Sequence, residues 1–140
     1  MSGRLLSINF ELREYKRYKE EEILTLYQAV GWSNYFNKPE MLKQAYENSL
    51  YTVGAYLADD LVGVIRVVGD GASILYIQDL LIHPSHQRKG IGRKLFEHVI
   101  DKYQDVYQKV LITDDTEKTK AFYENMGFKA EGVSFIQYTI

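Results

Sequence analysis

The feature that most constrains the fold is a strand pattern that leads through a polar loop and two glycines into an amphipathic helix. The expected strand covers residues 73–82 and ends at His83 and Pro84, and the glycines are Gly90 and Gly92. Beyond Gly90, apolar residues recur at helical spacing along one side of the chain. They are Ile91, Leu95, Phe96, Val99, Ile100 and Tyr103. Strand and helix therefore alternate in this part of the chain.

The other elements follow from the same two periodicities. An alternating strand is expected at 6–13, a helix at 20–30 that ends at Gly31, and a second helix that starts at Asn37 with Pro39 in its first turn. Strands are expected at 51–57, 61–68 and 109–113, a helix capped by Asp114, Asp115 or Thr116 that ends at Gly127, and final strands within 128–140. This order predicts an α/β domain with a mixed, mostly antiparallel central sheet and helices on both of its faces.

Length and composition exclude several classes of protein. The 140 residues suit one domain over 1–140, and the net charge of -2 gives no field that favours nucleic acid. No cysteine is present, which excludes disulfides and thiolate metal sites. No apolar run is long enough for a signal peptide or a membrane span, so we expect a cytoplasmic protein without a membrane partner. His83 and His86 share a loop, where solvation is a better explanation than metal binding.

The loop before the helix that follows Gly90 has the chemistry of a phosphate site. Backbone N–H groups are free at a helix start, and the helix dipole adds partial positive charge there. Glycine at positions 90 and 92 lets a phosphate approach the backbone, and Arg88, Lys89 and Arg93 add formal charge. A dinucleotide-binding turn would need a small residue where Leu95 stands, and no Gly-Lys-Ser/Thr follows as a P-loop requires.

These residues resemble a known family. The segment Gln87-Arg88-Lys89-Gly90-Ile91-Gly92 is similar to the Q/R-x-x-G-x-G/A signature of the GNAT superfamily of N-acetyltransferases, and Phe122-Tyr123-Glu124-Asn125-Met126-Gly127-Phe128 looks like its F-Y-x-x-x-G-F segment. The resemblance covers nearly the whole chain and points to a small bacterial-type member. It implies the GNAT acyl-CoA N-acyltransferase fold, acetyl-CoA as co-substrate, no metal, and transfer of an acetyl group to an amine.

The resemblance also implies roles for individual residues. The backbone of Leu81 and Ile82 would pair with the pantetheine arm, and residues Gln87, Arg88, Lys89, Gly90, Ile91, Gly92 and Arg93 would hold the pyrophosphate. Tyr123 would protonate the departing thiolate, although packing on its helix is the alternative. Phe122 would form core or a wall against the cofactor. Where many members have an asparagine that contacts the cofactor, this chain has Thr116.

The acceptor side is less determined by the sequence. Asp79 could act as the general base or could form an ion pair with Arg66, and Gln78 could orient the substrate. Since successive strand residues face opposite sides, only one of Asp79 and Gln78 should face the cleft. Trp32 and Tyr35 could line the acceptor pocket or pack on the core.

Together these residues predict an N-acetyltransferase that acts on a primary amine, and the aromatic loop favours a small molecule as the acceptor. Two alternatives remain open, a non-catalytic module that senses acyl-CoA and an enzyme that acts on a protein or peptide amine. By analogy, strands near the C-terminus could pair across subunits and form a homodimer.

Overall fold

The structure is a computed structural model, and it describes residues 9–139. The chain divides into two compact units, Met1–Val110 and Leu111–Ile140, and each is described here by itself. The first unit contains the sheet with four helices, and the second contains one helix and an extended C-terminal segment.

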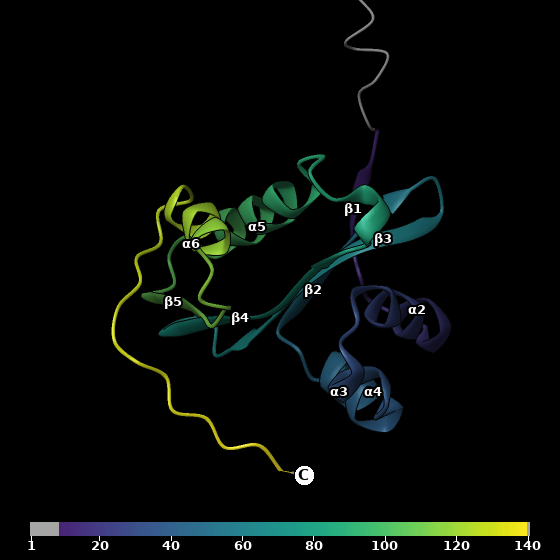
Figure 1. The fold of residues 1–140 in the computed structure, drawn as a ribbon, viewed down its shortest axis with the longest axis horizontal. Coiled ribbons are helices and arrows are strands. Elements are labelled where there is room, and N and C mark those ends of the chain that lie inside the picture. The colour runs from purple at the N-terminus through teal and green to yellow at the C-terminus, as the bar shows by residue number, and fades with distance from the viewer. Residues whose placement is uncertain (1–8, 140) are drawn as a thin grey trace, which may run out of the picture. The chain divides into compact units, whose positions relative to one another are not determined.

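The sheet has five strands in the order β1-β2-β3-β4-β5 (Figure 1). They are β1 (Glu11–Glu14), β2 (Tyr51–Leu57), β3 (Asp60–Gly69), β4 (Ile74–Ile82) and β5 (Gln108–Leu111). The first four pair antiparallel in sequence order. Two backbone hydrogen bonds join the start of β5 to the residues just before β4. The Tyr107 amide donates to the Ala72 carbonyl, and the Gln108 amide donates to the Ser73 carbonyl. The long central strand β3 is buried on both faces, because helices cover the sheet on either side.

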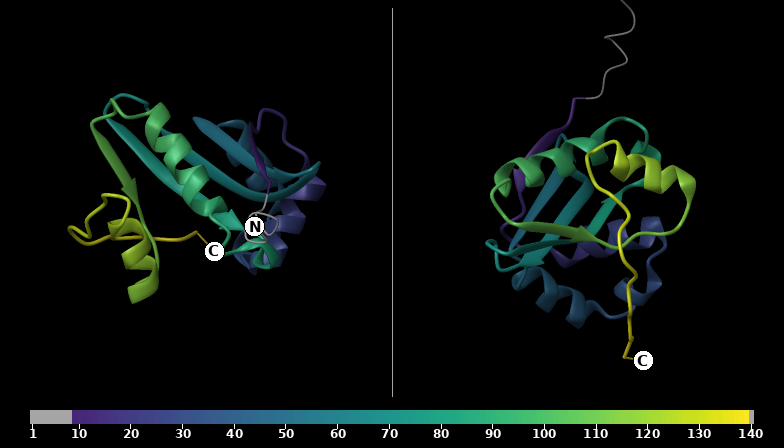
Figure 2. Two further views of the ribbon diagram at one scale, coloured as in Figure 1. Left: turned by 90° about the horizontal axis from the view of Figure 1, so that it is seen from above. Right: turned by 90° about the vertical axis from the view of Figure 1, so that its left-hand side faces the viewer.

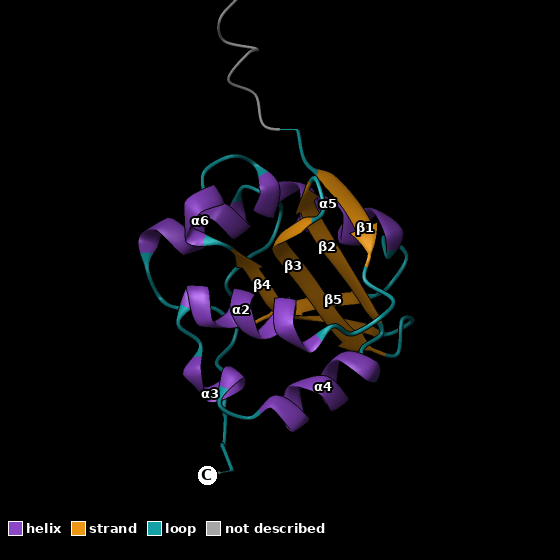
Figure 3. Cartoon of the chain, turned by 90° about the vertical axis from the view of Figure 1, so that its right-hand side faces the viewer, coloured by secondary structure: helices purple, strands orange, loops and turns teal. Residues whose placement is uncertain are grey.

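Helices lie on both faces of this sheet, as the sequence predicted. The helices α2 (Glu20–Val30), α3 (Ser33–Phe36) and α4 (Pro39–Glu47) lie on one face, and α5 (Ile91–Lys102) crosses the other (Figures 2 and 3). A short 3₁₀ turn, η1 (Pro84–His86), follows β4. Gly31 ends α2 in the left-handed conformation, with φ of 81°, as expected for a glycine C-cap.

The core on the α2 and α4 side combines helix stripes with alternating strand residues. Its buried members are Ile23, Leu26, Tyr27, Leu42, Tyr46, Val64 and Leu81. On the other face α5 buries Ile91, Leu95, Phe96 and Val99, which are four members of the stripe predicted from the sequence. The two apolar faces fix α2 and α5 against opposite sides of β3 and β4, and the loop between β4 and α5 is thereby held at the end of the sheet.

Two predicted boundaries in the first half are wrong. The helix expected from Asn37 begins at Pro39 with Lys38 as its N-cap, because Asn37 instead ends α3, a helical turn where the sequence indicated only a loop. The strand expected at 6–13 is observed as Glu11–Glu14, and its residues 6–8 lie outside the described part of the chain.

In the second unit, α6 (Glu117–Glu124) begins where the sequence predicted. Thr116 is its N-cap, and the Thr116 hydroxyl accepts a hydrogen bond from the Thr119 amide at 3.3 Å. The final strands expected within 128–140 are not observed, since residues 128–139 are extended without forming a strand. An alternating pattern becomes a strand only when its backbone pairs with another strand, and within the second unit residues 128–139 form no such ladder.

Candidate functional site

The loop between β4 and α5 presents unpaired backbone donors at the start of a helix. Gly90 is the N-cap of α5 with φ of 84°, and no side chain caps this helix end. The Lys94 amide donates to the Gly90 carbonyl, which closes the first turn and leaves the three preceding amides pointing out of the helix. Arg88 is also in the left-handed region, with φ of 64°. Alternation of left- and right-handed residues turns successive N–H groups toward one side, as in anion-binding nests.

The glycines and the charged side chains of this loop are consistent with an anion site. A Cβ added to Gly90 would meet no atom within 4 Å, so the space above it is open. At Gly92 a Cβ would come 3.7 Å from Ile82 Cγ1, which is ordinary contact. Arg88 and Lys89 are exposed, while the Arg93 guanidinium is paired with Glu97 at 3.1 Å. The loop thus offers two free cations and a row of amides to a phosphate group.

The end of β4 turns alternate backbone groups away from β3, and there the Ile82 carbonyl accepts from Gln87 Nε2 at 3.2 Å. The His83 amide donates to the Val62 carbonyl, so the alternation of an antiparallel ladder directs the backbone groups of Leu81 toward Val64. The N–H and C=O of Ile82 and Leu80 therefore face the opposite edge. Of the two residues predicted to pair with an extended ligand, Ile82 has this orientation and Leu81 does not. Leu80 shares the orientation of Ile82, as the two-residue period of a strand implies.

A β-bulge at Gln78 changes the direction of the next side chains. Asp79 pairs with Arg66 and Ile77 pairs with Val67, so Gln78 has no partner on β3. The Gln78 amide donates to the Tyr35 hydroxyl at 3.2 Å, and the Asp79 carboxylate accepts from the Tyr27 hydroxyl at 2.8 Å. Both side chains therefore reach the α2–α3 side. The expectation that only one of them could do so is wrong, because the bulge interrupts the strict alternation.

Asp79 is the centre of a buried polar cluster. Its Oδ2 accepts from Arg66 Nε at 2.8 Å, and the exposed fractions are 1% for Asp79 and 4% for Arg66. Of the two roles weighed for Asp79, the ion pair with Arg66 is present, and the catalytic role stays a prediction. The Asp79 Oδ1 atom is buried without a hydrogen-bond partner in the described chain.

The aromatic residues between α2 and α4 lie next to this cluster. Trp32 and Tyr35 are half-buried, and each packs edge-on against the Tyr27 ring, with centroid distances of 6.0 and 5.7 Å. The packing role considered for them is thus present, and their partly exposed surfaces remain available to a ligand. The sequence placed Tyr27 in a helix stripe but gave no sign that its hydroxyl would reach β4.

Tyr123 and Phe122 belong to the second unit and lie on α6. Both are half-buried, and their rings meet edge-on with centroids 5.0 Å apart. Burial, with a smaller effect of the Asp114 charge, raises the pKa of the Tyr123 hydroxyl above its usual value. Thr116 is occupied as the cap of α6, and its hydroxyl donates to Asp114 Oδ1 at 2.7 Å. A tyrosine with a raised pKa keeps its proton and can donate it.

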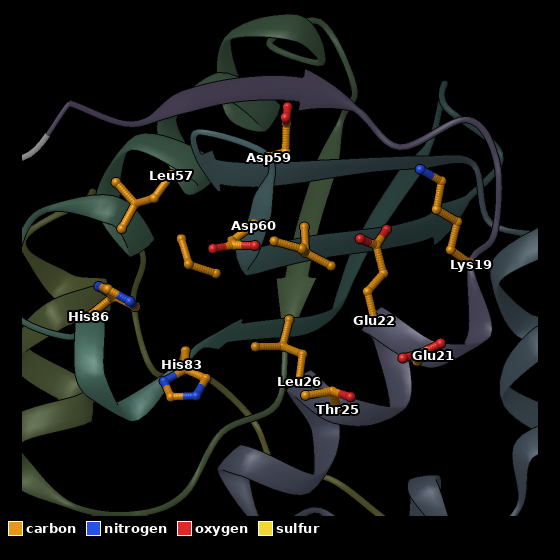
Figure 4. Close-up of a pocket in the computed structure, with 12 residues that line it drawn as sticks. Lys19, Glu21, Glu22, Thr25, Leu26, Leu57, Asp59, Asp60, His83 and His86 are labelled. Atoms are coloured by element: carbon orange, nitrogen blue, oxygen red, sulfur yellow. The ribbon is translucent and has the colours of Figure 1, made fainter.

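A pocket of about 700 Å³ opens elsewhere in the first unit, between α2, the β2–β3 turn and the loop after β4 (Figure 4). Figure 4 shows His83 and His86 on one side of it and Lys19 on the other. Its carboxylates are Glu21, Glu22, Asp59 and Asp60. No residue predicted for the site lines it, and four carboxylates beside one lysine disfavour an anionic ligand.

The described residues contain neither a metal-binding cluster nor a membrane-spanning helix. Within residues 9–139 no group of three or more His, Asp or Glu side chains is arranged to hold a metal ion. His83 Nδ1 accepts from the Ser85 amide at 3.1 Å, which gives it a structural role in the loop. None of the helices in the described residues has the length and apolarity needed to cross a membrane.

Comparisons with known proteins agree on one family. The sequence model described as "Acetyltransferase (GNAT) domain" matches residues 14–140. An uncharacterized N-acetyltransferase (ycf52-like) from Prochlorococcus marinus is 33% identical over an alignment of 117 positions, which covers 79% of this chain and 62% of that protein. The chain thus spans less than two thirds of that relative.

Two solved structures are similar over almost the whole chain. A GNAT-family acetyltransferase from Streptococcus pneumoniae TIGR4 has 39% identity and a TM-score of 0.82, covering 94% of this chain and 100% of that one. A protein from meticillin-resistant Staphylococcus aureus, described as a probable acetyltransferase, has 26% identity and a TM-score of 0.78, covering 93% and 100%.

Proposed function

The chain belongs to the GNAT family of acetyltransferases, and from that premise we propose that it transfers the acetyl group of acetyl-CoA to the primary amine of a small molecule. The observation that carries the proposal is the start of α5, where Gly90 leaves the helix uncapped. The unpaired amides at this helix start, next to the exposed cations Arg88 and Lys89, suit the negative charge of a pyrophosphate.

The proposed cofactor contacts use the two features that adjoin this loop. Residues Gln87, Arg88, Lys89, Gly90, Ile91, Gly92 and Arg93 hold the pyrophosphate, with Arg93 shared with Glu97. The backbone groups of Leu80 and Ile82 that face away from β3 bind the amide groups of the pantetheine arm as an added strand would. Leu81 contributes its buried side chain to the core and does not offer its backbone to the cofactor. Phe122 forms an apolar wall.

The chemistry of transfer requires one proton to leave the amine and one to reach the thiolate. Acetyl-CoA supplies the acetyl group as a thioester. A bond forms between the amine nitrogen and the acetyl carbon, and the carbon–sulfur bond breaks. We assign Tyr123 as the donor to the sulfur, because burial keeps its hydroxyl protonated at neutral pH. The amine proton passes to Asp79 or to water, and Asp79 has only its Oδ1 atom free to accept it.

The acceptor assignment rests on Trp32, Tyr35 and Gln78. The Gln78–Tyr35 hydrogen bond and the half-buried Trp32 place polar and aromatic surface side by side, which suits a small amine with an apolar body. A protein or peptide amine is the alternative acceptor, and a sensor without turnover is the alternative function. Turnover with small amines but not with basic peptides would support the first assignment.

Three further expectations belong to this proposal. We propose that both units form one GNAT domain, which the family match across residues 14–140 supports. We also propose a cytoplasmic protein that forms a homodimer without nucleic acid or membrane as a partner. The exposed apolar side chains of Val133 (80%), Phe135 (93%) and Tyr138 (73%) support pairing of the C-terminal segment with a second copy.

Calorimetric titration with acetyl-CoA tests the cofactor site. The variant Gly90→Glu places a carboxylate in the open space above the loop, and we expect it to abolish saturable binding. Gly31→Glu is the matched control, because Gly31 also caps a helix end in the left-handed region with open space around it. The control should bind like the wild type. Failure of the wild-type protein to bind acetyl-CoA would exclude the proposed function.

A further inference from the structure

The Tyr27 side chain contacts three of the four residues proposed for the acceptor side, Asp79, Trp32 and Tyr35. Its hydroxyl donates to Asp79 Oδ2 at 2.8 Å, on the residue that follows the β4 bulge. Its ring packs edge-on against both Trp32 and Tyr35. Tyr27 is fully buried, so it does not contact a substrate directly. Tyr27 therefore links the bulged strand β4 to Tyr35 in α3 and to Trp32, the N-cap of α3.

The hydroxyl of Tyr27 has a defined direction. A phenol has one proton to donate, and here it goes to the Asp79 carboxylate, so the Tyr46 hydroxyl must donate to Tyr27 across their 2.9 Å contact. Burial raises the pKa of Tyr27 well above its usual value, which keeps this proton in place. The Tyr27 ring consequently has one orientation relative to β4.

The ion pair fixes the other side of the same contact. Arg66 Nε donates to the Asp79 oxygen that Tyr27 also uses, and Arg66 Nη1 donates to Ser49 Oγ at 3.2 Å. The Asp79 carboxylate is thus held from β3 and from α2 at the position where β4 has its extra residue. Gln78 is that extra residue, and its amide meets the Tyr35 hydroxyl.

We propose that Tyr27 is a positioning residue for the acceptor amine, which it serves by locking Trp32 and Tyr35 against the β4 bulge through its hydrogen bond to the Arg66–Asp79 pair. Asp79 in this assignment acts through Tyr27 and Gln78 and does not take the proton of the amine. The inference rests on the proposed function for its kinetic consequence, but the locking itself concerns only residues of the first unit and can be measured without a substrate.

The first measurement uses Trp32, which is the only tryptophan of the sequence. In Tyr27→Phe the ring stays but its anchor is lost, so Trp32 emission should shift to the red and acrylamide should quench it more strongly. Tyr46→Phe is the matched control, since it removes a hydroxyl from the same buried cluster and leaves the bond between Tyr27 and Asp79 intact. Equal emission and quenching in Tyr27→Phe and wild type would overturn the proposal, whatever the protein acetylates.

The second measurement separates positioning from a general loss of folded protein. With an amine that the wild type acetylates, Tyr27→Phe should raise the KM for the amine about 10- to 100-fold, with the dissociation constant of acetyl-CoA unchanged. A merely structural defect would lower the active fraction and leave KM unchanged, and that result would contradict the proposal. If the wild type binds acetyl-CoA but acetylates no amine, the proposed function fails, and the fluorescence result alone decides the positioning role.

The pair itself provides a second variant that does not depend on Tyr27. Arg66→Met/Asp79→Leu replaces both charges by apolar side chains of similar size, which avoids a stranded buried charge. It should raise the KM for the amine as Tyr27→Phe does. A general base at Asp79 would instead lower kcat and remove the acidic limb of the pH–rate profile, and this outcome would overturn the assignment of Asp79 as a positioning residue.

Discussion

The side chains of Arg66 and Asp79 meet at 2.8 Å from neighbouring strands, at the step where the register between β3 and β4 shifts. An ion pair in this position resists any sliding of β4 along β3, because a shift would separate two buried charges. The bulge at Gln78 is therefore held by electrostatics as well as by the ladder. Bulges of this kind often lie beside functional sites, where they redirect side chains.

Breaking this pair on one side should destabilise the protein strongly. Asp79→Ala leaves the Arg66 guanidinium buried without its partner, and we expect it to lower the free energy of unfolding by about 3–5 kcal/mol. The double variant Arg66→Met/Asp79→Leu should lose much less or nothing. Urea unfolding followed by circular dichroism measures both values. A double variant as unstable as Asp79→Ala would show that packing, rather than charge, dominates at this position.

The sequence predicted those features that depend on one element at a time. The stripe of Ile23, Leu26 and Tyr27 located α2 at residues 20–30, and the hairpin of β2 and β3 followed from alternation around a turn. The helical spacing after Gly90 predicted a helix start there, and Gly90 is the N-cap of α5. Such features depend on periodicity and turn chemistry, which are local properties of the chain.

Features that depend on pairing between elements could not be predicted. The bulge at Gln78 exists only in the register of β4 against β3, so strict alternation misplaced one side chain. The choice of Lys38 over Asn37 as the N-cap of α4 depended on α3, a single turn without a periodic signal. The expected C-terminal strands, which are not observed, depended on pairing with another strand, and alternation within one segment does not specify such a pairing.

Arg88 combines backbone strain with charge, and two substitutions separate these contributions. Arg88→Gly relieves a left-handed conformation that costs a non-glycine residue about 1–2 kcal/mol, and the greater freedom of glycine when unfolded offsets part of the gain. We expect a net stabilisation of about 0.5–1 kcal/mol for Arg88→Gly and none for Arg88→Ala. Both variants should bind acetyl-CoA about tenfold more weakly, through loss of a charge-assisted hydrogen bond. Thermal unfolding measures the stability of both variants, and calorimetric titration measures their affinity for acetyl-CoA. Equal stability of Arg88→Gly and Arg88→Ala, or wild-type affinity in either variant, would contradict these expectations.

Asp70 makes the turn between β3 and β4 sensitive to acid. Its carboxylate accepts from the Ser73 hydroxyl and from the amides of Ala72, Ser73 and Ile74, and these bonds hold its pKa well below the usual range. The Asp70 carboxylate therefore binds a proton more weakly in the folded state than in the unfolded chain. The resulting stabilisation is complete above the usual pKa of about 3.9 and is lost as the pH falls further.

The variant Asp70→Asn tests this linkage. Asparagine keeps one acceptor oxygen but no charge, so the variant should have a lower urea midpoint than the wild type at pH 7. The difference should shrink between about pH 4 and pH 2, because the Asp70 carboxylate of the unfolded chain takes up its proton there while that of the folded protein is still ionised. A difference in urea midpoint that stays constant across this pH range would mean that the geometry of the turn, and not the charge of the carboxylate, stabilises it.

Tyr123 should influence the chemical step without influencing binding. Tyr123→Phe removes only the hydroxyl, and since thiolate is already a fair leaving group, we expect kcat to fall about 10- to 100-fold while the KM for acetyl-CoA stays constant. Because burial raises the pKa of Tyr123, the wild-type kcat should show no descending limb from this group below about pH 10. If the KM for acetyl-CoA rises in parallel with the loss of kcat, Tyr123 packs against the cofactor and another group protonates the thiolate. A steady-state comparison of wild type and variant from pH 6 to pH 9 distinguishes the two roles, since only a proton donor changes kcat alone.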